Sequence, residues 1–187
     1  DDVGNPIRTN VDKSYRLGLE LEAIIPITSK LTLQPNMTLS NNKIKETIIP
    51  FDGELQNLGQ TDISFTPSLV AANAIVFQPI KSLQMSLLSK YVGEQYMSNI
   101  EAEASKLDSY FINDFNISYT LKTKSVFDSI VFTGLVNNIL NVKYVSNGYY
   151  YTYDDTWSNP GTTETIEGAG FYPQATTNFL LGVTLKF

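Results

Sequence analysis

The chain has 187 residues and a formal net charge of −6, and 17% of its residues are charged. This charged share is below the roughly 25% of an average soluble domain, and the acidic balance disfavours a nucleic-acid surface, which would carry a basic stripe. Cysteine and histidine are absent, which excludes disulfides and thiolate chemistry and removes the commonest general base and metal ligand.

The chain contains no run of about 18 apolar residues, so no transmembrane helix is predicted. The start of the chain does not resemble a secretory signal. The opening DDVGNPIRTN reads as the interior of a polar loop. We therefore expect the chain to be the C-terminal part of a longer protein.

Seven strands are predicted in chain order, because apolar and polar residues alternate over long stretches with a period of two. They lie within 14–26, 30–42, 61–79, 82–96, 109–121, 129–138 and 177–187. The third strand should begin after Pro67, which lacks a backbone donor. Polar stretches at about 41–60 and 97–108 and a long segment from about 138 to 173 are predicted to connect the strands as loops.

One face of each predicted strand is apolar and the other is polar. The charged residues of the strands all fall on the polar face: Arg16, Glu20, Glu22, Lys90, Glu94, Asp114 and Lys186. The apolar face has three polar exceptions, Asn73, Ser89 and Asn113. A lysine or arginine on the lipid face at the membrane midplane would cost about 2–4 kcal/mol, and the observed distribution is what such a cost would produce.

Short and long connections alternate along the chain, as in an up-and-down antiparallel sheet with short turns at one end and long loops at the other. Outer-membrane β-barrels have this asymmetry, with strands of about ten alternating residues. A soluble sheet also excludes charge from one face, but its strands are usually about 5–6 residues long. The fold class predicted is an all-β transmembrane barrel.

The last strand ends at Phe187, which we place at the periplasmic edge. Seven strands cannot close a bacterial barrel, which has an even number of strands, and open sheet edges are not tolerated in lipid. We therefore expect further strands upstream in the same polypeptide.

Several stretches resemble the C-terminal end of a TonB-dependent outer-membrane receptor. LGLELEAIIPITSKLTLQPNMTLSNNKI resembles the strand–turn–strand hairpin of the family, and TPSLVAANAIVFQP resembles its proline-led strand. VNNILNVKY resembles the penultimate-strand motif Asn-x-Leu-(Asp/Asn)-x-x-Tyr, here Asn138, Leu140, Asn141 and Tyr144. GFYPQATTNFLLGVTLKF resembles the aromatic ending of the family, in a style similar to receptors of Bacteroidetes.

This resemblance covers essentially residues 1–187 and implies the last seven strands of a 22-stranded barrel in the bacterial outer membrane. The N-terminal plug and the earlier strands would lie outside this chain. The implied partners are outer-membrane lipid, the plug and remaining strands, TonB acting through the plug, the barrel-assembly machinery, a nutrient ligand and a surface lipoprotein. The alternating residues of the ending are similar to the assembly signal: Phe179, Leu181, Val183, Leu185 and Phe187.

The implied function is active import of a scarce nutrient such as siderophore-bound iron, haem, cobalamin or an oligosaccharide. Two alternatives remain: a passive porin or structural barrel, and a soluble β-sheet binding module. An upstream plug would separate the receptor from the porin, and solubility without detergent would support the soluble module.

Aromatic residues crowd the long segment near the C-terminus and are the candidate ligand contacts: Tyr149, Tyr150, Tyr151, Tyr153 and Trp157. They could form an aromatic lid over the outer mouth, since aromatic side chains give large amphipathic contact areas. The alternative is that part of the segment is strand extending above the membrane, with tyrosines at the interface.

Polar residues suggest two further sites. The candidate wall contacting the plug or the solute comprises Arg16, Glu20, Glu22, Lys90, Glu94 and Asp114, although a wet wall without a specific partner would look the same. Asp154, Asp155, Glu164 and Glu167 could be considered for calcium, but their spacing is not that of an EF-hand. We predict a solvated acidic loop with no metal or cofactor.

Catalysis would require a nucleophile with a base or a pair of carboxylates. Ser89 and Lys90 are adjacent, so their side chains point to opposite faces of a strand. We predict that the chain is not an enzyme.

Overall fold

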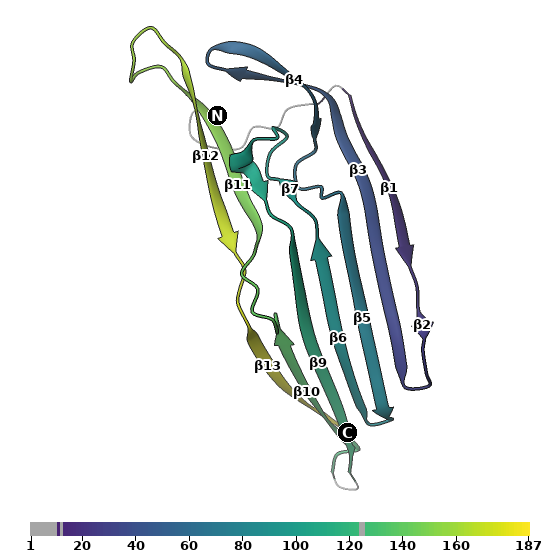
Figure 1. Cartoon of the computed structure of the whole chain (residues 1–187). Coiled ribbons are helices and arrows are strands. Elements are labelled where there is room, and N and C mark those ends of the chain that lie inside the picture. The colour runs from purple at the N-terminus through teal and green to yellow at the C-terminus, as the bar shows by residue number, and fades with distance from the viewer. Residues whose placement is uncertain (1–10, 12, 124–125) are drawn as a thin grey trace.

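The computed structural model describes residues 11, 13–123 and 126–187, and almost all of its regular structure is antiparallel β-strand. Seven strands form one continuous sheet in the order β1-β3-β5-β6-β9-β10-β13 (Figure 1). They are β1 (Ser14–Glu22), β3 (Leu31–Phe51), β5 (Leu69–Ile80), β6 (Leu83–Val92), β9 (Tyr110–Lys122), β10 (Ser129–Asn137) and β13 (Asn178–Lys186). The seven predicted strands and their antiparallel arrangement are confirmed.

Short connections gather at one end of the sheet, the turn end, and long ones at the other, the loop end (Figure 1). At the turn end, β2 (Ile25–Pro26) continues β1 along β3, and a tight turn leads back into β3. β5 begins at Leu69, after Pro67 as predicted. The alternation of connection lengths that the sequence showed therefore corresponds to two different ends of one sheet.

The prediction of a loop at 41–60 is wrong. β3 continues as one strand to Phe51, turns at Asp52–Gly53 and returns as β4 (Glu54–Asp62). Both turn residues have positive φ, at 52° and 77°, as a two-residue hairpin turn with an Asp-Gly sequence requires. This hairpin extends past the sheet into solvent, so both of its faces carry polar side chains. The sequence there consequently lacks the apolar–polar alternation that would have predicted a strand.

The two other predicted loops also contain regular structure. The segment at 97–108 includes a 3₁₀ turn, η1 (Glu103–Ser105), and β8 (Lys106–Leu107), which pairs with β7 (Gln95–Tyr96). The segment at 138–173 contains a long hairpin of β11 (Val145–Asp155) and β12 (Glu164–Pro173). The alternative interpretation of the tyrosine-rich segment, as strand extending beyond the sheet, is the one that the backbone shows.

Register brings the apolar positions of all seven strands onto one face. Across neighbouring strands Leu33 pairs with Ile75, Ile75 with Leu87, and Leu87 with Phe115. The row continues through Val136 to Phe179. The opposite face carries the polar positions, so the two-sided pattern of the sequence becomes a two-sided sheet.

The three polar exceptions on the apolar face lie in one row. Asn73 pairs with Ser89, and Ser89 pairs with Asn113. The Ser89 hydroxyl and the Asn113 side-chain oxygen are 2.6 Å apart, and Asn113 is only 6% exposed. Because unpaired polar groups are costly in apolar surroundings, this hydrogen bond explains how Ser89 and Asn113 occur there. The Oδ1 of Asn73, in contrast, is buried without a hydrogen-bond partner among the described residues.

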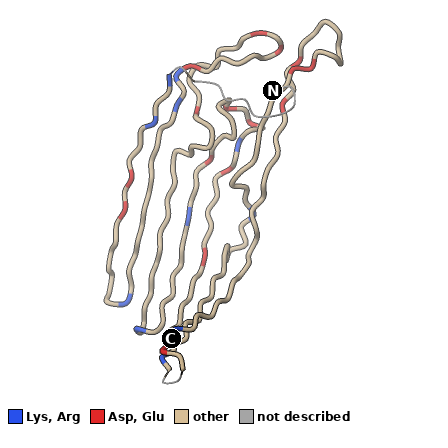
Figure 2. The backbone as a smooth tube through the Cα atoms, turned by 180° about the vertical axis from the view of Figure 1, so that it is seen from behind, with Lys and Arg blue, Asp and Glu red and all other residues tan. Residues whose placement is uncertain are grey.

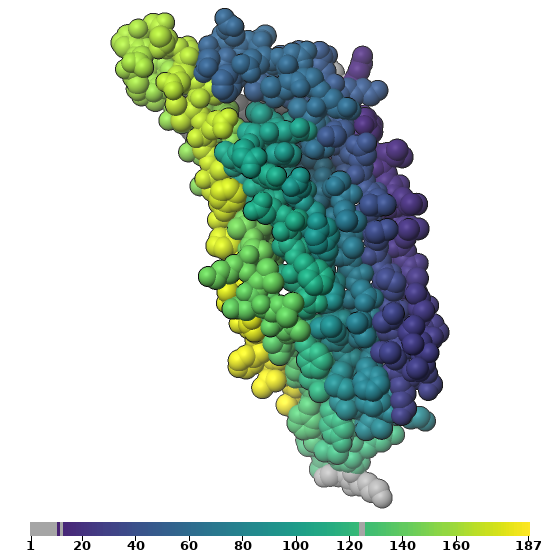
Figure 3. All heavy atoms as spheres, in the orientation of Figure 1, coloured from purple at the N-terminus to yellow at the C-terminus, as the bar shows by residue number. Residues whose placement is uncertain are grey.

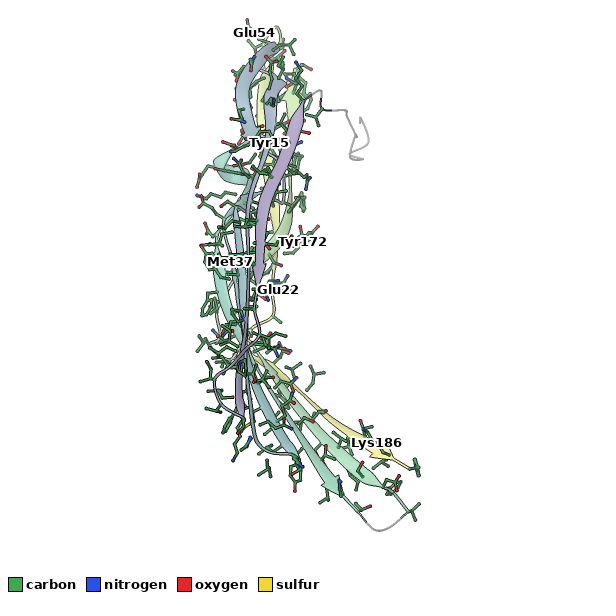
Figure 4. The ribbon with its side chains drawn as sticks, turned by 90° about the vertical axis from the view of Figure 1, so that its right-hand side faces the viewer. Tyr15, Glu22, Met37, Glu54, Tyr172 and Lys186 are labelled. Carbon is green, nitrogen blue, oxygen red and sulfur yellow. The ribbon has the colours of Figure 1, made fainter. Side chains whose placement is uncertain are left out.

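The sheet is a single curved layer, which Figure 4 shows edge-on with Glu22 on the concave side and Met37 on the convex side. Among the described residues only four large apolar side chains are buried, namely Ile44, Val92, Met97 and Leu107. All four lie toward the loop end. In the part of the chain that the structure describes, no second layer covers either face of the sheet, whereas a soluble sheet buries one face in a packed core.

No helix in the described part of the chain is both long and apolar enough to span a membrane.

Candidate functional site

Five aromatic side chains form a row on one face of the β11–β12 hairpin. Tyr149, Tyr151 and Tyr153 alternate along β11, with successive ring centroids 6.3 and 6.4 Å apart. Trp157 stacks on Tyr153 at 6.0 Å, and Tyr172 of β12 lies 6.1 Å from Tyr149. Their side chains are between 44% and 66% exposed. We call these five residues the aromatic row.

Glycines on β12 make room for the aromatic row. A Cβ atom on Gly170 would lie 2.4 Å from the Tyr149 ring, and one on Gly168 would lie 2.4 Å from the Tyr151 ring. These two glycines face the tyrosines directly across the hairpin. Any side chain there would displace a ring, so Gly168 and Gly170 are site residues that the sequence analysis missed; the alternating pattern G168-A-G170 was the available signal.

The aromatic row faces the concave side of the sheet. Figure 4 shows Tyr172, a member of the row, on the same side as Glu22. Of the predicted ligand contacts, Tyr149, Tyr151, Tyr153 and Trp157 are therefore brought together, while Tyr150 is not, because strand alternation turns it to the opposite face.

Tyr150 lines a cavity of about 360 Å³ between the β11–β12 and β3–β4 hairpins. Its hydroxyl is buried without a hydrogen-bond partner among the described residues. Burial, together with the Glu167 carboxylate, raises the pKa of Tyr150 to about 12. The phenol thus stays neutral at physiological pH.

The concave face of the sheet carries most of the predicted wall residues. Glu22, Lys90 and Asp114 line a hollow of about 580 Å³ at mid-sheet. Arg16 and Glu20 lie further along β1 on the same face. Glu94 differs: it lies beyond the end of β6 and pairs with Lys106 at 3.0 Å, which raises the pKa of that lysine. Figure 2, from the concave side, shows charged residues sparse along the strands and frequent near the loop end.

Asp114 also has a structural contact that the sequence did not predict. Its Oδ1 accepts a hydrogen bond of 2.7 Å from the backbone N–H of Asn138, where β10 stops. Asn138 has φ 49° and is 3% exposed. Its side-chain amide donates to the carbonyls of Val142 and Ala175, and its Oδ1 accepts from Val142 N–H.

Two further motif residues, Asn141 and Tyr144, together with Thr177, complete this junction between the sheet and the outer hairpin, whereas Leu140 is 60% exposed. The Thr177 hydroxyl donates to the Asn138 carbonyl at 2.7 Å, and the Asn141 side chain accepts from Thr177 N–H. Tyr144 packs on Tyr110 with ring centroids 4.4 Å apart. The junction, defined by Asp114, Asn138, Asn141, Tyr144 and Thr177, joins β10 to β11 and β12 to β13.

Of the alternating residues predicted as an assembly signal, Phe179, Leu181, Val183 and Leu185 lie along β13, an edge strand of the sheet, and Phe187 follows directly after its end. They are strongly exposed, Leu181 and Phe187 at 81% each. The Phe187 ring contacts Phe127 edge-on at 4.9 Å.

The acidic residues near the β11–β12 tip are not gathered together. In the described ranges no group of three or more potential ligands is placed to hold a metal ion. Asp155 instead accepts backbone hydrogen bonds from Trp157 and Ser158. The Ser158 hydroxyl, followed by the backbone N–H groups of Ser158 and Trp157, lowers the pKa of Asp155.

No family model and no curated protein matches the chain, but solved structures do. The siderophore receptor PiuA from Acinetobacter baumannii is similar with a TM-score of 0.57 and 14% identity, over 91% of this chain and 22% of that one. A mutant of the ferric enterobactin receptor PfeA from Pseudomonas aeruginosa has a TM-score of 0.50 and 15% identity, over 94% and 23%.

The ferric-catecholate import receptor Fiu from E. coli K12 matches with a TM-score of 0.50 and 14% identity, over 96% of this chain and 29% of that one. The chain thus has the fold of part of an outer-membrane receptor barrel. It spans less than a third of the length of each of these structures.

Proposed function

We propose that this chain forms the C-terminal barrel wall of a TonB-dependent outer-membrane receptor that imports a scarce nutrient. The observation that carries the proposal is the sheet itself. One apolar face crosses all seven strands and is uncovered by the other described residues, and the opposite face carries the charged residues Glu22, Lys90 and Asp114. An exposed apolar surface of this extent marks contact with a membrane or a partner. In a barrel, lipid would cover the convex face and a plug the concave face.

The edges of the sheet support a larger barrel. Among the described strands, β1 and β13 each have one neighbour in the sheet, and lipid does not tolerate open edges. Upstream strands of the same polypeptide would pair with both edges, and the barrels of this size known from the family have a plugged lumen. The loop end would then face the cell exterior, and β13 would present the signal to the assembly machinery.

The aromatic row is the proposed ligand contact. It lies on the concave side at the loop end, where a solute entering the lumen would pass. Flat or amphipathic ligands such as catecholates, haem, cobalamin or sugar rings would pack on such rings. The similar solved structures are siderophore receptors, which favours a siderophore among these classes.

The proposal is tested on the intact protein from the source organism. Outer membranes should contain a polypeptide that includes the sequence TNFLLGVTLKF and has a mass several-fold above the 20.9 kDa of this chain. Its deletion should reduce uptake of its nutrient as strongly as deletion of TonB does. Uptake that persists without TonB would favour the porin, and a product of about 20.9 kDa in the soluble fraction would favour the soluble module.

The aromatic row gives a prediction for ligand affinity. Tyr151→Ala in the intact receptor should weaken ligand binding about tenfold, because an anchoring aromatic contact is worth more than about 1 kcal/mol. Gly170→Ala should weaken binding comparably, since its methyl group displaces Tyr149 without removing any aromatic atom. Ala169→Ser, on the other face of the same strand, is the control. Titration calorimetry would measure all three, and unchanged binding in both row variants would contradict the assignment.

A further inference from the structure

The tips of two hairpins that are distant in sequence are joined by a reciprocal pair of hydrogen bonds. Asp52 N–H donates to Thr165 Oγ1 at 2.7 Å, and Thr165 N–H donates to Asp52 Oδ1 at 2.7 Å. The Thr165 hydroxyl in turn donates to Asp154 Oδ1 at 2.8 Å. We call Asp52, Thr165 and Asp154 the clasp. Figure 3 shows the two tips in contact at the loop end.

Local backbone geometry holds both halves of the clasp in place. Asp52 occupies the first position of the Asp-Gly turn, whose positive φ values leave its N–H and carboxylate facing outward from the hairpin. Thr165 sits opposite Asp154 in the β11–β12 register. A Cβ atom on Gly53 would lie 3.3 Å from the Cβ atom of Thr163, so the backbones of the two tips also approach each other closely at this point.

Below the clasp the two hairpins separate. The cavity of about 360 Å³ lies between them, with Phe51 and Gln56 on one side and Tyr150 and Glu167 on the other. β11 and β12 form a two-stranded sheet of their own, which is not hydrogen-bonded to the strands of the main sheet. The clasp therefore fixes the tip of a hairpin whose base is fixed by the junction.

The hairpin that the clasp holds is the one that carries the aromatic row. We propose that Asp52 and Thr165 are positioning residues, which hold the aromatic row over the concave face from a hairpin more than one hundred residues away in sequence. That the clasp positions the aromatic row does not depend on the proposed function. That the positioned row contacts a ligand rests on the proposed function. The clasp makes no ligand contact itself, so it acts through Tyr151 and its neighbours.

The test uses spin labels on the intact receptor in detergent micelles. Leu55→Cys and Asn159→Cys place one label on each tip, and both positions are exposed. Pulsed electron paramagnetic resonance should give one narrow distribution of the distance between the two spin labels in the parent protein. Thr165→Val removes the hydroxyl and keeps the side-chain volume, and Asp52→Ala removes the acceptor; each should broaden the distribution and reduce the closed population about tenfold, the effect expected for net hydrogen-bond losses of this kind.

Two matched variants separate positioning from general damage. Thr163→Val makes the same change two residues away and should leave the distribution narrow, and Thr165→Ser keeps the hydroxyl and should do the same. A second label pair at Asn147→Cys and Asn159→Cys spans the β11–β12 hairpin alone and should not change in any variant. A Thr165→Val protein with the parental distance distribution between the tips would overturn the proposal.

Binding of a ferric complex of 2,3-dihydroxybenzoate provides the functional readout. If the parent receptor binds this probe, Thr165→Val should weaken binding severalfold and Thr163→Val should not; equal affinity in the two variants would overturn the role in ligand contact. A parent receptor that does not bind the probe counts against a catecholate ligand, while the distance measurements still decide whether the clasp positions the row.

Discussion

Leu87→Arg is expected to lower the free energy of unfolding of the intact protein by about 2–4 kcal/mol, the range measured for arginine on the lipid face near a bilayer midplane. Leu87 lies halfway along β6 on the convex face, between Ile75 and Phe115. A guanidinium group there would enter hydrocarbon without a counter-charge. The folded yield in outer membranes should fall accordingly.

The adjacent residue provides the matched control. Leu88 faces the concave side and pairs across the strands with Asp114. Leu88→Arg therefore adds the same charge one residue away, in a wet hollow beside a carboxylate, and should cost less than about 1 kcal/mol. Unfolding in lipid vesicles or heat-modified mobility on gels would compare the two. Equal costs would contradict the assignment of the convex face to lipid.

Asn138→Ala is expected to destabilise the protein by about 3 kcal/mol, because it leaves buried backbone groups without partners. The substitution removes the hydrogen bonds to Val142 and Ala175. It also places alanine at a positive φ, which asparagine tolerates far better. The base of the outer hairpin should loosen, and limited proteolysis should cut first near residues 138–144.

The neighbouring asparagine shows what the junction adds. Asn137 makes one exposed side-chain hydrogen bond, to Asn178 at 2.8 Å. Asn137→Ala should cost less than about 1 kcal/mol, the net value of an ordinary hydrogen bond. Thermal unfolding of both variants measures the difference, and similar losses of stability would mean that the junction is not a specific structural element.

The strands of the main sheet could be predicted from the sequence, because within that sheet each has one apolar and one polar face. Along β1 and β13 the large apolar residues at alternate positions lie on one face. A period of two in the sequence therefore predicts both the strand and the face to which each side chain points. The three exceptions Asn73, Ser89 and Asn113 were visible as exceptions. Their common row was not, because register depends on pairing between strands and not on any one of them.

Prediction was wrong where strands leave the sheet. Residues 41–51 continue β3 with polar side chains on both faces, and a pattern method reads such a stretch as loop. The Asp52–Gly53 sequence is a recognisable signal for a two-residue hairpin turn. The clasp between Asp52 and Thr165 could not be predicted from the sequence, since it joins exposed polar residues of ordinary type over a large separation.

The aromatic residues illustrate the same limit within the candidate site. Their clustering was evident from composition, and four of the five predicted contacts do share a face. Tyr150 is the exception, because the segment forms a strand, in which neighbouring side chains point to opposite faces. Tyr172 and the two glycines belong to the surface through β12, which only the pairing of the hairpin reveals.

The four buried side chains at the loop end and the strands below them would be surrounded by different solvents, water and lipid, in the proposed barrel. In the proposed barrel, the buried residues Ile44, Val92, Met97 and Leu107 would lie outside the bilayer. Their burial would then carry the heat-capacity change of water-exposed apolar surface and weaken on cooling. In the proposed barrel, the strands below would exchange lipid chains for protein contacts and carry little of that signature. Temperature and bilayer composition would then act on different halves of the same molecule, and the outer hairpins would keep their own melting behaviour in any detergent that holds the strands.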